Sequence, residues 1–70
     1  MRYLIVIEKS RTGYSAYSPD VPGCVATGTT RQRTAKAMRE AIEFHIKGLR
    51  ADGQRVPAPR SSSEYVEIPA

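Results

Sequence analysis

The chain has 70 residues, a net charge of +4, one cysteine and no tryptophan. A chain this short buries only about 60% of the surface that it exposes when unfolded, so we expect one domain, 1–70, that associates with another chain. One cysteine excludes an internal disulfide, and no apolar run approaches the roughly 20 residues that cross a membrane, which predicts a cytoplasmic protein.

The first predicted strand is RYLIVIE, 2–8, whose apolar side chains point to both faces. A strand of this kind is expected to be central in its sheet or pressed against a second subunit. The polar stretch KSRTG predicts a hairpin turn into a second, antiparallel strand, YSAYS, 14–18.

The next segment, YSPDVPGCVATG, combines two prolines, two glycines and an aspartate. Pro19 and Pro22 fix φ, and Gly23 is expected to adopt a backbone conformation that other residues resist. Asp20 is expected to accept a hydrogen bond from its own loop. We interpret the segment as a shaped corner, and together with Tyr17 these residues are a candidate partner surface.

A third short strand, CVATGT, leads to Thr30, which stands where a helix N-cap is expected. Apolar residues at helical spacing predict a helix from about residue 31 to about residue 51, with Gly53 as the glycine that ends it. One face of this helix packs on the sheet, and the opposite face is charged.

A flank of small residues runs beside the apolar face of the predicted helix: Ala37, Ala41 and Gly48, with Phe44 next to them. Small side chains let another backbone approach closely, and an aromatic ring away from the core needs a cover. This flank is a candidate protein interface. The alternative is that Phe44 folds back over the helix end within the same subunit.

The start of the helix is basic: Arg31, Arg33, Lys36 and Arg39 are candidate phosphate contacts. They support an alternative function, an oligomeric nucleic-acid-binding protein whose affinity falls steeply with salt.

Residues that could carry chemistry are few. His45 is the only histidine and Cys24 the only cysteine, so neither a nucleophile with a base nor a metal site is predicted, and no cofactor is expected. A third hypothesis, a metal-dependent nuclease around Glu8, Asp20 and Glu40, requires carboxylates that converge. The expected protein is not an enzyme.

After the helix, QRVPAPRSSS predicts an irregular connection, because it holds two prolines and three serines. EYVEI, 64–68, alternates and is predicted to be a fourth, edge-like strand. The fold class is therefore α+β with the order β-β-β-α-β.

Two segments, GYSAYSPDVPGCVATGTT and DGQRVPAP, closely resemble the motifs of the HicB-like antitoxin family. The resemblance implies a degenerate RNase H-like fold, an antiparallel three-stranded sheet with an additional C-terminal strand and one packed helix. It also implies an antitoxin that binds and neutralises a small HicA-like mRNA-cleaving toxin, and a homo-oligomer, either a dimer or a dimer of dimers. Many such proteins carry a C-terminal DNA-binding segment; the sequence stops at Ala70, so we expect a member without it.

Overall fold

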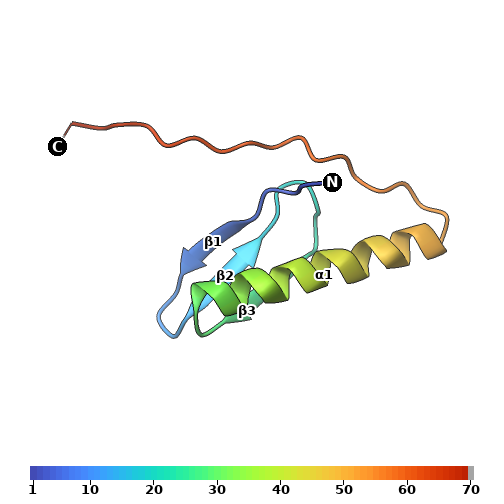
Figure 1. Cartoon of the computed structure of the whole chain (residues 1–70), viewed down its shortest axis with the longest axis horizontal. Helices are drawn as coiled ribbons and strands as arrows, with labels where there is room; N and C mark the ends of the chain where they lie inside the picture. Colours follow the sequence, from blue (N-terminus) through green and yellow to red (C-terminus); the bar gives the residue numbers. More distant parts are fainter. Residues whose placement is uncertain (70) are drawn as a thin grey trace.

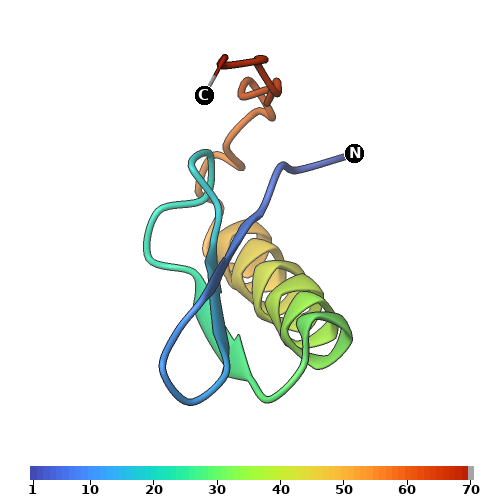
Figure 2. The same ribbon diagram turned by 90° about the vertical axis from the view of Figure 1, so that its left-hand side faces the viewer.

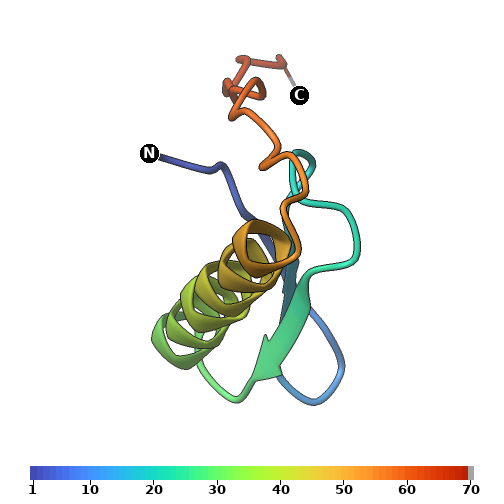
Figure 3. The same cartoon turned by 90° about the vertical axis from the view of Figure 1, so that its right-hand side faces the viewer.

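The structure, a computed structural model, describes residues 1–69 and consists of a small sheet, one long helix and an extended C-terminal segment (Figure 1). Strands β1 (Val6–Lys9), β2 (Tyr14–Tyr17) and β3 (Val25–Gly28) form an antiparallel sheet in the order β1-β2-β3. Helix α1 (Arg31–Ala51) covers one face of the sheet, and no element of residues 1–69 covers the other (Figures 2 and 3). The predicted α+β class is confirmed.

The β1–β2 hairpin forms as its polar connection predicts. The backbone N–H of Ser10 donates to the carbonyl of Gly13 at 2.8 Å. A Cβ atom at Gly13 would collide with the carbonyl oxygen of Gly28, so a glycine is needed where these backbones meet. β1 lies at an edge of the sheet, so the predicted central position is wrong, and the alternative, a strand pressed against a second subunit, remains a prediction.

Helix α1 begins and ends at the predicted residues because both termini are capped. The side chain of Thr30 accepts a hydrogen bond from the N–H of Arg33 at 3.0 Å. At the other end, Gly53 has φ +67°, and the N–H groups of Gly53 and Gln54 donate to the carbonyls of Arg50 and Leu49. This pair of bonds is a Schellman motif, which requires the left-handed conformation that glycine adopts without strain.

The core lies between α1 and the sheet, and it continues into the loop after β2. Its buried side chains are Ala16, Val21, Cys24, Met38, Ile42 and Ile46. Where β3 meets α1 the packing is so close that a Cβ atom at Gly28 would lie 2.6 Å from Oγ1 of Thr34. The apolar face predicted for the helix is therefore the face that packs on the sheet.

The predicted fourth strand, 64–68, does not form in this single chain: among residues 1–69 only β1, β2 and β3 are strands. Two contacts tie the chain after the helix to the residues before β1 and to the loop after β2. The hydroxyl of Tyr3 donates to the carbonyl of Pro57, and Asp20 binds Arg60 and Ser61. Beyond Ser61 the segment extends away from the sheet and helix, and its residues are exposed (Figure 1).

Candidate protein-interaction surfaces

The loop between β2 and β3 is a corner made of two successive turns. The N–H of Val21 donates to the carbonyl of Ser18, and the N–H of Cys24 to that of Val21, both at 3.3 Å. Val21 is fully buried, so the corner is anchored in the core. Gly23 has φ +88°, the conformation predicted for it.

The sequence predicted that Asp20 accepts a hydrogen bond from its own loop, and this prediction is wrong. Asp20 binds the C-terminal segment instead. Its Oδ2 accepts from the N–H groups of Arg60 at 2.9 Å and Ser61 at 2.8 Å, and its Oδ1 accepts from the hydroxyl of Ser61. The backbone bond from Ser61 is the largest cause that lowers the pKa of Asp20 below its ordinary value. The corner is already closed by backbone bonds, which leaves the carboxylate free for this contact.

An apolar row crosses the face of the sheet that α1 does not cover. Val6 is the register partner of Tyr17, and Tyr17 is the register partner of Val25. Ala16, the neighbour of Tyr17, is buried under the helix, so the three side chains of the row point to the opposite face. Tyr17 is 42% exposed and Val25 69% exposed.

The helix flank of small residues lies on the β3 side of α1, where the thiol of Cys24 contacts the carbonyl oxygen of Ala41. Phe44 is 81% exposed, so it does not fold back over the helix end in this chain, and that alternative is wrong. At Gly48 a Cβ atom would meet nothing within 4 Å. Phe44 and Gly48 are exposed, whereas Ala37 and Ala41 are half-buried, and the role of the flank as an interface remains a prediction.

The basic residues at the start of α1 are all exposed. The guanidinium of Arg33 donates to the hydroxyl of Thr29 at 3.4 Å, and Nε of Arg39 pairs with Glu43 at 3.4 Å. No side chain is acidic in the first helical turn, so Arg31 and Arg33 lie unfavourably at the positive end of the helix dipole.

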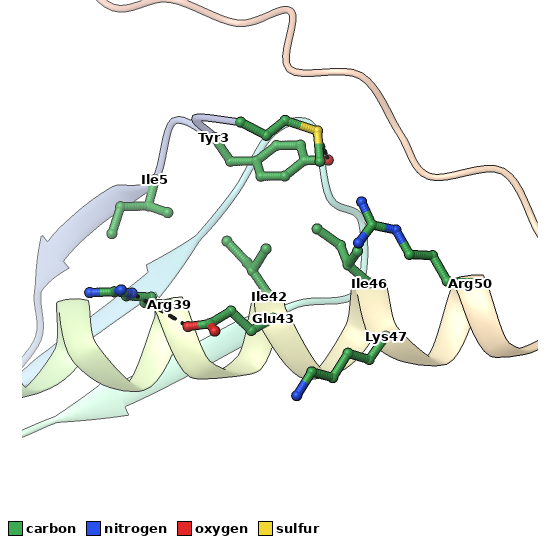
Figure 4. A pocket seen from close by; sticks show the side chains of 9 residues that line it. Tyr3, Ile5, Arg39, Ile42, Glu43, Ile46, Lys47 and Arg50 are labelled. Carbon is green, nitrogen blue, oxygen red and sulfur yellow. Dashed lines mark hydrogen bonds and ion pairs between the residues drawn. The ribbon is translucent and has the colours of Figure 1, made fainter.

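A groove of about 630 Å³ opens on the other side of the helix, between α1 and the chain that leads into β1. Figure 4 shows Ile42 and Ile46 pointing up from the helix toward Ile5 and Tyr3. Its remaining lining residues are Met1 and the charged side chains Arg39, Glu43, Lys47 and Arg50.

The carboxylates of Glu8, Asp20 and Glu40, named for a metal-dependent nuclease, do not form a metal-binding cluster in residues 1–69. No cluster of three His, Cys, Asp or Glu side chains there could hold a metal ion. Burial raises the pKa of the Cys24 thiol, which disfavours the reactive thiolate. No helix in this part of the chain is long and apolar enough to cross a membrane.

The sequence did not predict two features of these surfaces, the place of Val25 in the apolar row and the groove beside α1. Val25 completes the apolar row, and a signal for it existed, because it alternates with Ala26 in a β-prone stretch. The groove had no such signal, since it joins the first five residues of the chain to the last turns of the helix.

Comparison with known proteins gives these surfaces a context. Residues 3–70 match the model of the HicB-like antitoxin of bacterial toxin-antitoxin systems. The chain belongs to the HicB-like antitoxin family. The resemblance inferred from the two motifs is thereby confirmed.

Relatives of this HicB-like chain include a 14.9 kDa protein of Haemophilus phage HP1, 39% identical over 99% of this chain and 52% of the relative. Antitoxin HicB 2 of Photorhabdus laumondii is 30% identical over 100% of this chain and 51% of its own length. A UPF0150 protein of Thermoplasma acidophilum is 30% identical over the full length of both chains. The chain thus spans about half of the first and second relatives and all of the third.

Among solved structures, the "HicA3 and HicB3 toxin-antitoxin complex" contains a similar chain. The TM-score is 0.72 and the identity 35%, over 86% of this chain and 70% of that chain.

Proposed function

We propose that this HicB-like chain is a non-enzymatic antitoxin module that binds and neutralises a small HicA-like, mRNA-cleaving toxin. Family membership supports the antitoxin role, and the similar chain in a toxin-antitoxin complex supports a toxin as the partner. The chain would act in the cytoplasm, where Cys24 stays a free, buried thiol. We also propose that it works as a homo-oligomer.

The observation that carries the choice of surface is the apolar row Val6, Tyr17 and Val25 on the uncovered sheet face. Exposed valine and tyrosine side chains in one row are typical of a protein contact, because water leaves them when a partner covers them. The corner that joins Tyr17 to Val25 borders the row, so Pro19, Pro22 and Gly23 belong to the same proposed surface.

The test uses two substitutions on the same face of β3. Val25→Asp places a charge in the apolar row and should abolish capture of the toxin and its neutralisation. Thr27→Asp is the matched control, because Thr27 lies two residues along the same strand, is exposed, and has Ser15 rather than Tyr17 as its register partner.

The experiment begins with a tagged chain in its native cell at low salt, followed by mass spectrometry of small proteins that co-elute. The co-eluting protein is then expressed alone, and relief of its growth arrest by wild-type, Val25→Asp and Thr27→Asp chains is compared. If both variants relieve growth arrest as the wild type does, the proposed surface is wrong. If no toxin is recovered and nucleic acid washes off with salt, the antitoxin function is wrong.

Phe44 offers a second candidate surface, on the β3 side of the helix. Phe44→Ser should weaken an association made there without unfolding the chain, because the ring is exposed and contributes little to the core. An unchanged oligomer mass together with unchanged toxin capture would remove this flank from consideration.

A further inference from the structure

A second pocket, of about 340 Å³, lies where the β1–β2 hairpin turn meets the end of β3 and the connection to α1. Figures 1, 2 and 3 all place this turn and this connection at the same end of the molecule. Besides two glycines, the pocket is lined by five hydroxyl side chains: Ser10, Thr12, Tyr14, Thr27 and Thr29. None of the lining side chains is acidic, and none is purely hydrocarbon, so the pocket suits a polar ligand.

The backbone around the pocket is fixed. Tyr14 is the register partner of both Lys9 on β1 and Gly28 on β3. The turn is closed by the bond from Ser10 to Gly13, and a Cβ atom at Gly13 would collide with the carbonyl oxygen of Gly28. The hydroxyl groups therefore stand on a preorganised framework, which lowers the cost of ordering them around a ligand.

Two cations contact the walls of the pocket from opposite sides. From the hairpin, Nζ of Lys9 lies 5.2 Å from the centre of the Tyr14 ring in a cation–π contact. From α1, the guanidinium of Arg33 donates to the hydroxyl of Thr29 at 3.4 Å. A third cation, Arg11, belongs to the hairpin turn itself.

These cations have no acidic partner in the described part of the chain. The one ion pair of residues 1–69 joins Arg39 to Glu43, further along α1. Glu8 is the neighbour of Lys9 in β1, but alternation along the strand points its side chain to the other face of the sheet. Uncompensated cations beside a pocket of hydroxyl groups indicate an anionic ligand.

Phosphate groups along a strand fit this arrangement. Lys and Arg side chains, together with the hydroxyls of Ser, Thr and Tyr, are the groups that contact nucleic-acid phosphates. Because cations flank the pocket on two sides, a ligand with repeated negative charge can contact both. The volume is at the lower limit of small-ligand sites, which suits one sugar–phosphate unit of a single strand.

We infer that this pocket binds a phosphate group of a single-stranded nucleic acid, with Lys9 and Arg33 as the cations and Thr12 and Thr29 among the hydroxyl donors. The inference goes beyond the proposed toxin binding and does not depend on it. The apolar row proposed for the toxin lies at the other end of the same three strands.

Fluorescence anisotropy with a labelled RNA of about twelve uridines tests the site at low salt. The pocket variant, Lys9→Gln with Arg33→Gln, should raise the dissociation constant at least about tenfold. It should also make the slope of log affinity against log salt concentration shallower by about 1.4, since two phosphate contacts are lost.

The matched control is Lys36→Gln with Arg39→Gln, which removes two predicted phosphate contacts on α1 outside the pocket. It should change the dissociation constant by no more than about threefold, because these charges act only from a distance. Equal losses in the control and the pocket variant would assign the binding to the basic helix surface and overturn the inference.

A second variant tests the hydroxyl groups without changing the charge. Thr12→Val with Thr29→Val keeps the shape of both side chains and should raise the dissociation constant about fivefold with an unchanged salt slope. Circular dichroism and urea unfolding check that all variants fold. An unchanged dissociation constant in the folded variant would show unspecific charge attraction and overturn the inference.

Competition identifies the source of the phosphate. Uridine monophosphate should displace the RNA only at concentrations at least about a hundredfold above those of unlabelled strand, because it cannot engage both sides of the pocket. Equal affinity of the mononucleotide would overturn the assignment to a strand, and a wild type that binds no RNA would overturn the site. Val25→Asp should bind RNA within about twofold of the wild type, so the toxin and RNA proposals fail independently.

Discussion

At the carboxylate of Asp20, two parts of the chain that are forty residues apart are held together. Two backbone N–H groups and one hydroxyl donate to it, which is how a carboxylate fixes the position of an irregular segment. Because the corner around Asp20 is anchored by the buried Val21, the bonds transmit a fixed position to Arg60 and Ser61.

Asp20→Asn should release this segment. The amide keeps one acceptor oxygen for the two backbone N–H groups, but it loses the negative charge and puts an NH₂ group where Oδ1 accepts from the hydroxyl of Ser61. We expect hydrogen exchange at the amides of Arg60 and Ser61 to become several-fold faster, while exchange within α1 stays unchanged. Equal exchange in both proteins would show that other contacts hold the segment.

Acid should have the same effect. Because folding lowers the pKa of Asp20, the contribution of these bonds is complete above the ordinary aspartate pKa of about 3.9 and is lost as the pH falls through the lower folded value. The amide shift of Ser61, followed by NMR from about pH 6 to about pH 2, should move at that lower pKa. In Asp20→Asn the transition should be missing.

At the scale of elements, the start of α1 combines good capping with poor electrostatics. Thr30 caps the first turn, but the turn contains Arg31 and Arg33 and no acidic side chain. A helix N-terminus carries a partial positive charge, so cations there cost stability. Residues that cost stability and remain exposed are candidates for a function, which here is contact with an anion.

Arg31→Glu should therefore stabilise the fold by about 0.3–1 kcal/mol in urea unfolding at low salt. Arg31→Gln, which only removes the charge, should give a smaller gain. If the chain binds nucleic acid through this end of the helix, Arg31→Glu should also weaken that binding. The slope of log affinity against log salt concentration should then become shallower by about one. A stability loss in Arg31→Glu would show that Arg31 makes a favourable contact.

At the scale of the whole molecule, the core is small and much apolar surface stays exposed. Among residues 1–69, six apolar residues form the buried core, whereas Val25, Phe44, Tyr65, Val66 and Ile68 face water. We therefore expect this chain to gain stability when another chain covers these residues.

The melting temperature should consequently rise by a few degrees when the protein concentration rises a hundredfold, since association stabilises the folded state by mass action. Calorimetry at several concentrations measures this. A wild-type melting temperature that does not change with protein concentration would indicate that the monomer is stable without association.

The sequence alone determined the parts of the molecule that depend on local forces. The helix ran from residue 31 to residue 51 as predicted because Thr30 and Gly53 are caps that act within one turn, and its apolar face followed from its period. The family followed from two short motifs. Gly23 took its positive φ because the corner leaves few other solutions.

Only the tertiary structure decided which distant residues meet. It placed β1 at an edge, moved the bonds of Asp20 from its own loop to Arg60 and Ser61, and left 64–68 unpaired. It also joined the start of the chain to the end of the helix in one groove. Strand pairing and segment docking depend on which partner packs best against a surface, and alternation along a strand does not identify that partner.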